Sequence, residues 1–430
     1  MKITRLSLRD FRGFRSLDLD LSPDVTALVG VNGAGKTSVL DAMAFLFSCL
    51  TEGIRTGEPT KVALQDNDVR LGSSTASIEV TAEVGGNTVR WSGTKTLPGY
   101  PPAALGSLDA LRVPIAAAQT TLAAGSPLLP LIVYFPTNRS AFDIPARIRT
   151  PHVFDALSAY DGALEGGASN FRGFFEWFRE EEDIANEQEV RRAKGQTSLL
   201  PLLTGEPEAS AQPSPLPVVR AAIERLVPGA RNIIIERRPQ RMTLELNGLR
   251  LDVAQLSDGE KCLFALAGDL ARRMALAAPK VERPLELPAI VLIDEIELHL
   301  HPGLQRDVLP RLQEVFPEAQ FIISTHSPQV LSSIHAANVR IFERFELRLL
   351  DRGTWRRDTN RILEAAFGDP GRPPDVATKL DQLRDAVDAD HHEEARRLIR
   401  ELGEMIEGDD PDVFFYEQLL PPEGSPGAAS

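Results

Sequence analysis

The sequence predicts an α/β fold with a mixed central sheet, an inserted helical lobe and a helical C-terminal region. A glycine-rich loop at 30–38 lies between an apolar strand and an amphipathic helix, which indicates that strands and helices alternate. Two further apolar segments, 289–293 and 320–324, end in polar residues, as the buried strands of parallel sheets do. Segments of alternating polarity at 2–9 and 16–21 predict additional strands around a tight turn.

Length and composition limit the class of protein. The 430 residues are enough for two or three lobes around a large core. The apolar runs are far shorter than a membrane span, and Met1 leads straight into a predicted strand, so we expect a cytoplasmic protein without membrane contact. Cys49 and Cys262 are too few for a disulfide framework. The net charge of −14 argues against a surface coated with nucleic acid but leaves one basic groove open.

The loop at 30–38 has the residues of a phosphate-binding site. Its three glycines let successive backbone N–H groups converge on one anion, and Lys36 can reach the β- and γ-phosphates. The Thr37 hydroxyl stands at a helix N-terminus, where it can ligate Mg²⁺. We therefore predict a site for ATP and Mg²⁺. The expected contacts of the loop are Asn32, Gly33, Ala34, Gly35, Lys36, Thr37 and Ser38.

Two arginines outside the loop are further candidates for phosphate contacts. Arg12 and Phe14 lie in the turn between the first two predicted strands, where the guanidinium could bind phosphate and the ring could stack on adenine. Packing at the sheet edge explains the same residues equally well. Arg139 follows a predicted strand at 131–135, and a structural ion pair is the alternative role for its side chain.

A second anion site is predicted at the start of a long helix that runs to Ala277. Ser257 and Gly259 stand at its N-terminus, where the hydroxyl and the free N–H groups of the first turn can bind a phosphate. The chain has a single phosphate loop and a single such helix end. We therefore expect subunits to pair head to tail, as a homodimer or higher oligomer, with each completing the site of the other.

Acidic residues close the apolar strand at 289–293. Asp294 is predicted to hold Mg²⁺, and Glu295 to polarise the water that attacks the γ-phosphate. The strand at 320–324 is followed by His326, which can hydrogen-bond a γ-phosphate and sense its loss. His299 and His301 have the spacing of a metal-binding pair, but the nearby sequence offers no third ligand, so zinc is not expected.

Taken in order, these motifs resemble those of the ABC-type ATPases of the SMC, RecF and OLD group. The resemblance spans residues 1 to about 345 and implies an SMC/RecF-like ATPase head, in which 256–261 would be the signature motif and His326 the switch histidine. Asp258 departs from the pattern, because transporters have glycine there. Gln65 is the only candidate for the Q-loop residue.

Within the group, 294–302 and 320–331 look most like the ATPase subunit of Septu and Septu-type retron systems, the PtuA family, and 360–368 resembles its C-terminal region. This resemblance implies antiphage defence with a separate HNH-type nuclease as partner. A RecF-like role in DNA repair and a self-contained OLD-type nuclease are the alternatives. The latter is disfavoured, because 345–430 contains no apolar strand ending in the paired acids that a Toprim-type metal site needs.

The sequence predicts four regions. Apolar stripes on two helices near 380–387 and 395–406, together with Val413 to Tyr416, predict that the last region contacts a partner or a sister subunit; packing of the helices on each other and on the core is the alternative. The regions are an N-terminal ATPase lobe at 1–150, a helical insertion at 151–230 with a flexible loop at 195–217, a C-terminal ATPase lobe at 231–350 and a helical region at 351–430.

Overall fold

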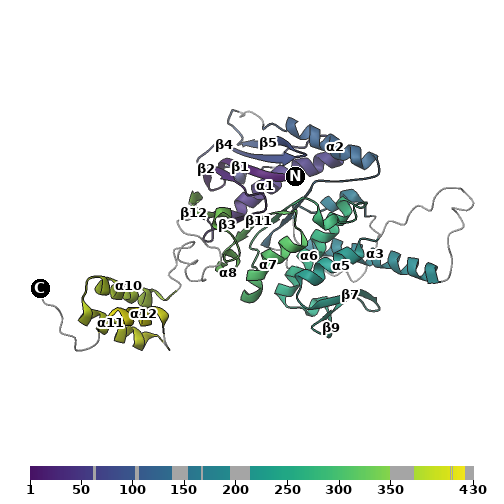
Figure 1. Cartoon of the computed structure of the whole chain (residues 1–430). Coiled ribbons are helices and arrows are strands. Elements are labelled where there is room, and N and C mark those ends of the chain that lie inside the picture. The colour runs from purple at the N-terminus through teal and green to yellow at the C-terminus, as the bar shows by residue number, and fades with distance from the viewer. Residues whose placement is uncertain are drawn as a thin grey trace, which may run out of the picture. The chain divides into compact units, whose positions relative to one another are not determined.

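The computed structural model of the chain divides into two compact units, Met1–Arg357 and Asp358–Ser430 (Figure 1). It describes residues 1–61, 64–101, 106–137, 154–165, 168–193, 214–348, 372–406, 408 and 410–421. Three sequence predictions lie outside the described residues: Arg139, the segment 360–368, and 195–213 of the loop expected to be flexible.

A six-stranded mixed sheet forms the centre of the first unit, in the order β13-β12-β3-β11-β10-β6. The strands from β12 to β6 run parallel, and β13 pairs antiparallel with β12. Every residue of β3, β6, β10 and β11 is buried, as expected for parallel strands covered on both faces. The predicted α/β fold with a mixed central sheet is therefore confirmed. The strands are β3 Val25–Val29, β6 Leu131–Phe135, β10 Ala289–Ile293, β11 Gln320–Thr325, β12 Val339–Glu343 and β13 Glu346–Arg348.

Two smaller antiparallel sheets complete the strands of the first unit. One has the order β2-β1-β4-β5, and its burial alternates along β1 and β4 as the polarity pattern predicts. The other has the order β7-β8-β9; the sequence prediction misses β9, although Asn247 and Gly248 form a tight turn at positive φ just before it. The strands are β1 Lys2–Phe11, β2 Phe14–Asp20, β4 Thr75–Val84, β5 Asn87–Thr96, β7 Ala230–Arg237, β8 Gln240–Leu246 and β9 Leu249–Asp252.

Helix α1, Lys36–Thr56, follows the glycine-rich loop. It is longer than the helix over 37–46 that the sequence predicts, because its apolar residues continue to Ile54 before Gly57 ends it. Its length and composition alone would let it cross a membrane, but 67% of its apolar window is buried inside the structure, as in a core helix. The other helices of the unit are α2 Arg112–Ala123, α3 Ala168–Ala193, α5 Leu216–Leu226, α6 Asp258–Ala277, α7 Pro302–Val315 and α8 Pro328–Leu331. Short 3₁₀ turns lie at Asp66–Asp68, Asp109–Leu111, Ala156–Tyr160, Val253–Gln255, Pro284–Glu286 and Ala336–Asn338.

The aromatic residues of α3 pack inside the first unit. The ring of Phe174 meets Phe264 of α6 edge to face, with 5.9 Å between the ring centroids. Phe171 also contacts Phe264, at 6.5 Å. This cluster packs against a neighbouring helix, and α3 is thereby fixed to the helix that begins after Ser257.

The second unit is a small helical bundle of α10 Pro374–Asp388, α11 His392–Met405 and α12 Pro411–Leu419. The predicted apolar stripes of α10 and α11 pack on each other through residues such as Leu383, Leu398 and Leu402. Phe414 and Phe415 of α12 remain 59% and 57% exposed. The bundle thus covers its own stripes and presents two aromatic rings to solvent.

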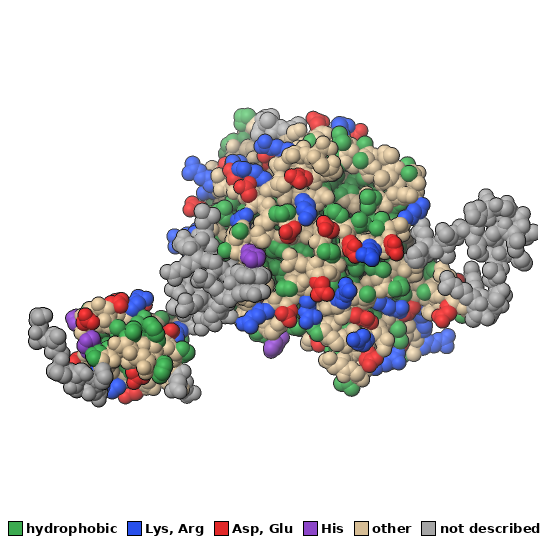
Figure 2. Space-filling model, in the orientation of Figure 1, with side chains coloured by type: hydrophobic (Ala, Val, Ile, Leu, Met, Phe, Trp, Pro, Cys, Tyr) green, Lys and Arg blue, Asp and Glu red, His purple; other side chains and the backbone are tan. Residues whose placement is uncertain are grey.

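Acidic and basic side chains are interspersed on the face of each unit that Figure 2 shows, with hydrophobic side chains between them.

Candidate nucleotide-binding site

The parallel sheet brings the predicted motifs to one edge. In the parallel register Thr325 of β11 lies beside Val29 of β3, and Ile293 of β10 lies beside Ile323. The segments that follow these strands therefore leave the same carboxyl edge of the sheet, where ligands bind in open α/β sheets. They carry the glycine-rich loop, the acidic pair and His326.

Two glycines of the loop are required by both backbone geometry and space. Gly30 has φ 150°, and a Cβ there would lie 2.3 Å from the carbonyl oxygen of Phe342. Gly35 has φ 104°, and its Cβ would lie 2.6 Å from the ring of Phe14. Larger residues cannot occupy these positions without strain. The backbone path of the loop therefore depends on glycine at both positions.

Lys36 is buried at the start of α1, and its ammonium turns back over the loop. Nζ donates to the carbonyl oxygen of Gly30 at 2.9 Å and to that of Val31 at 3.2 Å. Burial lowers the pKa of Lys36. Three carboxylates oppose this shift through their charge: Asp294, Glu295 and Glu297. A buried cation thus lies within the electrostatic reach of an acidic cluster.

Thr37 and Asp294 meet directly, as predicted, although they are far apart in the sequence. Thr37 Oγ1 donates to Asp294 Oδ2 at 2.8 Å, and Ser324 Oγ donates to the other carboxylate oxygen. Asp294 is almost completely buried, with 2% of its surface exposed. A hydroxyl and a carboxylate are hard oxygen donors of the kind that Mg²⁺ prefers, so this pair fits the predicted metal ligands.

Glu295 lies just after the end of β10, and His326 lies just after the end of β11. Glu295 has φ 47°, an uncommon conformation for a residue other than glycine, and its N–H donates to Ser324 Oγ at 2.7 Å. His326 is half-buried, and burial lowers its pKa, with the charge of Lys36 acting in the same direction. The carboxylates of Glu297, Glu295 and Asp294 oppose the shift. Lys36 and His326 therefore share one electrostatic environment.

Glu297 belongs to this cluster, and the sequence analysis misses it. Its Oε1 accepts a hydrogen bond from the backbone N–H of His326. The sequence does show a third acidic residue two positions after Glu295. It gives no indication, however, that the side chain of this residue contacts the segment after the neighbouring strand β11.

Arg12 is held by two carboxylates. Nε donates to Asp68 Oδ1 at 2.9 Å, and Nη1 donates to Asp41 Oδ2 at 2.6 Å. Burial acts to lower the pKa of Arg12, but the hydrogen bonds to Asp41 and Asp68 outweigh it and raise the pKa. Tyr134 donates to the other oxygen of Asp41, so this network connects the turn, α1 and the end of β6. A phosphate contact of Arg12 remains a prediction.

Phe14 packs at the sheet edge, which was one of the two roles expected for it. Its buried ring lies 5.2 Å from Phe345 and 5.9 Å from Phe342, edge to face in both cases. It also covers Gly35. The ring therefore supports the loop and is not available to stack on adenine.

Gln65 donates its backbone N–H to Asp68, and its role as the Q-loop residue stays a prediction.

Ser257 and Gly259 begin α6 with local contacts. Ser257 accepts from the N–H of Glu260 and donates to its carboxylate, which forms a capping box. A Cβ at Gly259 would lie 2.6 Å from the carbonyl oxygen of His299. Asp258 pairs with Lys261 at 3.5 Å. In the described part of the chain, no hydrogen bond links Ser257 to the loop at 30–38.

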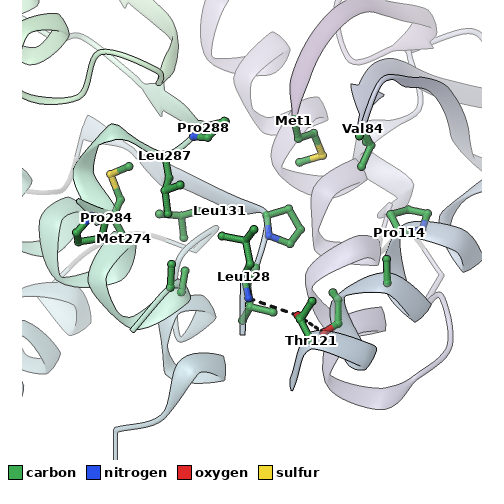
Figure 3. A pocket seen from close by; sticks show the side chains of 17 residues that line it. Met1, Val84, Pro114, Thr121, Leu128, Leu131, Met274, Pro284, Leu287 and Pro288 are labelled. Atoms are coloured by element: carbon green, nitrogen blue, oxygen red, sulfur yellow. Dashed lines mark hydrogen bonds between the residues drawn. The ribbon is translucent and has the colours of Figure 1, made fainter. Parts of the chain in front are cut away.

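A separate apolar cavity of about 360 Å³ lies elsewhere in the first unit (Figure 3). None of the 17 side chains that line it is charged, and Met274, Leu128 and Leu287 point into it. Leu131 and Pro288 place it at the amino ends of β6 and β10, whereas the acidic pair follows the carboxyl end of β10. The cavity therefore does not belong to the nucleotide site.

Known proteins are similar to this chain over most of its length. A family profile described as "AAA domain" matches residues 5–192, and one described as "AAA domain, putative AbiEii toxin, Type IV TA system" matches residues 137–332. The chain is 30% identical to the "Retron Ec83 probable ATPase" of Escherichia coli over 461 aligned positions, which cover 95% of this chain and 85% of the relative.

Two further similarities cover different shares of the chain. An 86-residue segment is 38% identical to "Septu protein PtuA" of Bacillus mycoides (strain KBAB4), covering 20% of this chain and 12% of that protein. Among solved structures, the SMC head bound to the C-winged helix domain of ScpA is similar in fold, with 17% sequence identity and a TM-score of 0.45. The superposition covers 81% of this chain and 98% of the SMC head chain. The predicted resemblance to retron and Septu ATPases is confirmed, over a short segment in the case of Septu.

Proposed function

Because the chain belongs to the family of the retron Ec83 probable ATPase, we propose that it binds and hydrolyses ATP and thereby regulates a separately encoded nuclease in bacterial defence against phage. The hydrogen bond between Thr37 and Asp294 carries the ATPase part of this proposal. It joins the phosphate loop to the acidic strand end, 257 residues apart in the sequence, as ATP hydrolysis with a metal requires.

The loop and the start of α1 would bind the triphosphate. The backbone N–H groups from Asn32 to Ser38 surround the phosphates, and Lys36 supplies a positive charge at their β- and γ-groups. Its present partners are two backbone carbonyl oxygens, which phosphate oxygens can replace. Arg12 would add a second cation from the neighbouring turn.

Thr37 and Asp294 would hold Mg²⁺, which neutralises charge on the β- and γ-phosphates when it is bound. Ser324 keeps the Asp294 carboxylate oriented by donating to its second oxygen. Glu295 would orient and polarise the attacking water, and His326 would donate a hydrogen bond to the γ-phosphate. The last two groups act on atoms that change charge during hydrolysis, so they are the catalytic residues of the proposal.

A second copy of the chain would complete the site. Ser257 and Gly259 of one subunit would meet the γ-phosphate bound to Lys36 of the other, because the helix end that carries them has no hydrogen bond to the loop of its own chain within the described residues. In this arrangement 1–150 and 231–350 form the two lobes of one ATPase head, with the helices of 151–230 inserted between them in the sequence. The working compartment is the cytoplasm.

The second unit would bind the nuclease, which we expect to be of the HNH type. Its helices already bury their apolar stripes against each other, and the exposed rings of Phe414 and Phe415 offer apolar surface to a partner. The protein with bound ATP and the protein without it would have different affinities for the nuclease, and ATP would regulate the nuclease in this way.

The ATPase part is tested by Glu295→Gln. This variant should keep ATP binding within about threefold of the wild type and slow hydrolysis at least ~100-fold, because the carboxylate acts mainly on water in the transition state. Binding is measured by titration calorimetry and hydrolysis by phosphate release. Unchanged hydrolysis in this variant would remove Glu295 from the mechanism.

The nuclease part is tested by co-purification with the product of the neighbouring HNH gene. Truncation after Asp351 should leave ATP binding intact and abolish capture. The double variant Phe414→Ser with Phe415→Ser should weaken capture at least ~10-fold, because exposed aromatic side chains are typical energetic centres of interfaces. The matched control is Gln418→Ser on the same helix. Full capture by the truncated chain would place the docking surface on the first unit instead.

A further inference from the structure

Glu297 lies in the nucleotide site but has no part in the roles assigned above. It follows the acidic strand end in the connection between β10 and α7, and its side chain is half-buried. Its Oε1 accepts the N–H of His326, while Oε2 is buried and has no hydrogen-bond partner among the described residues. A half-satisfied buried carboxylate at a proposed active site needs an explanation.

The contacts between the ends of β10 and β11 show what Glu297 adds. The N–H of Ile296 donates to the carbonyl oxygen of Ser324 at 3.1 Å, and the N–H of Glu295 donates to Ser324 Oγ at 2.7 Å. Both of these contacts end at Ser324. The position of His326, two residues further along, is tied to the β10 side by the Glu297 carboxylate.

Glu297 also faces the charged groups of the site. Its negative charge acts to raise the pKa of both Lys36 and His326, and thus opposes the effect of burial on each. The other charged groups that act on His326 are Lys36, Asp294 and Glu295. One carboxylate therefore influences both the position and the charge environment of the histidine.

The side chain is not needed to form the turn that carries it. The connection is closed by backbone hydrogen bonds from Leu298 N–H to the carbonyl oxygen of Glu295 and from Leu300 N–H to that of Glu297, both at 2.9 Å. Removing the carboxylate leaves these bonds in place. We therefore expect substitutions of Glu297 to preserve the local fold.

We propose that Glu297 is a positioning residue for ATP hydrolysis, whose carboxylate fixes the backbone of His326 so that the imidazole meets the γ-phosphate. This inference rests on the proposed ATPase function. It assigns Glu297 no contact with the nucleotide, so its loss should affect turnover and leave ATP affinity in place.

Kinetics of the full-length chain test this role. Glu297→Ala should lower kcat at least ~10-fold while KM and the calorimetric Kd for ATP stay within about threefold. Glu297→Gln should retain most of kcat, because its amide oxygen can still accept the His326 N–H. Glu318→Ala and Glu318→Gln, at an exposed carboxylate of the same unit, are the matched controls. A normal kcat in Glu297→Ala, or a loss of ATP affinity equal to the loss of kcat, would overturn the proposal.

A double-mutant cycle separates positioning from a general structural effect. If Glu297 acts through His326, then the double variant should have a kcat less than about twofold below that of His326→Ala alone. Independent effects that multiply would contradict the inference.

Hydrogen exchange tests the contact without relying on hydrolysis. In the nucleotide-free protein, the peptide that contains His326 should exchange faster in Glu297→Ala than in the wild type, and Glu297→Gln should restore its protection. Unchanged exchange in Glu297→Ala would contradict the proposed contact even if the wild-type chain hydrolysed no ATP. Absence of ATP binding by the wild type would instead refute the proposed function.

Discussion

The N-termini of α1 and α6 were both predicted to bind phosphate, and the structure equips them differently. α1 has Gly35 as its N-cap residue and therefore no side-chain cap. It has no acidic residue in its first turn, and Thr37 contacts Asp294, which is distant in the sequence. α6 begins with a complete capping box and has Asp258 and Glu260 in its first turn. Its positive end is thus already paired with negative groups of the same helix.

This difference separates a site that the single chain assembles from one that it leaves incomplete. The N–H groups in the first turn of α1 have no acceptor within their own helix and no side-chain cap at Gly35, so they suit an external anion. At α6 the acidic side chains must turn away, or a second subunit must rearrange them, before a phosphate can bind. The comparison therefore favours α1 as the primary nucleotide site and assigns α6 a role that depends on subunit pairing.

The largest effect on ATP affinity is expected when the lysine at the start of α1 is replaced, and the lysine at the start of α6 provides the comparison. Lys36→Ala should weaken ATP binding at least ~100-fold, because it removes the only lysine charge within the loop. Lys261→Ala, which removes a lysine paired with Asp258 at the start of α6, should change binding by less than about threefold. Titration calorimetry measures both. Equal losses would mean that the two helix ends do not differ as described.

A second prediction concerns the metal ligands at α1. Asp294→Asn should reduce the enhancement of ATP binding by Mg²⁺ about 10-fold, because an amide oxygen is a weaker ligand than a carboxylate. Asp258→Asn at α6 should leave the Mg²⁺ dependence unchanged. The measurement is a series of ATP titrations at increasing Mg²⁺. A Mg²⁺ response that survives in Asp294→Asn would exclude this carboxylate as the main ligand.

A third prediction uses the close packing at α6. Gly259→Ala places a Cβ 2.6 Å from the backbone oxygen of His299, so it should lower the free energy of unfolding by about 1–3 kcal/mol. Gly173→Ala in α3 of the same unit, where a Cβ would make only an ordinary contact at 3.7 Å from Arg272, serves as the control. Urea denaturation followed by tryptophan fluorescence gives the comparison. Equal stability of wild type and Gly259→Ala would show that α6 moves away from His299 readily.

The smallest effect is expected from the cap itself. Ser257→Ala removes the side-chain cap of α6 and should lower the free energy of unfolding by about 1 kcal/mol. Its effect on ATP binding by the isolated subunit should be negligible. A large loss of binding at concentrations where the protein is monomeric would show that Ser257 contacts nucleotide within its own chain.

Sequence reasoning worked where a motif is local. The strand, the glycine-rich loop and the helix are contiguous, so their chemistry could be predicted, and the parallel sheet then brought Asp294 to Thr37 as expected. The turn at Asn247 and Gly248 was also a local signal for β9, and the prediction overlooked it.

Contacts between distant segments could not be predicted in the same way. The ring of Phe14 was open to two roles until the structure placed Phe342 and Phe345 against it. Glu297 became visible only through its bond to His326 on the next strand. The carboxylates that hold Arg12 likewise come from α1 and from the segment before β4. Each of these depends on tertiary packing, which the spacing of residues in a sequence does not specify.

The central claim is that α1 of one subunit and α6 of another form one composite nucleotide site. It is tested most directly by mixing Lys36→Ala chains with Ser257→Arg chains, each of which should be inactive alone. A heterodimer contains one site with both defects and one site with neither. We therefore expect the rate of ATP hydrolysis per heterodimer to recover to as much as half of the rate per wild-type dimer. Heterodimers that are shown to form and yet recover no ATPase activity would contradict the composite site.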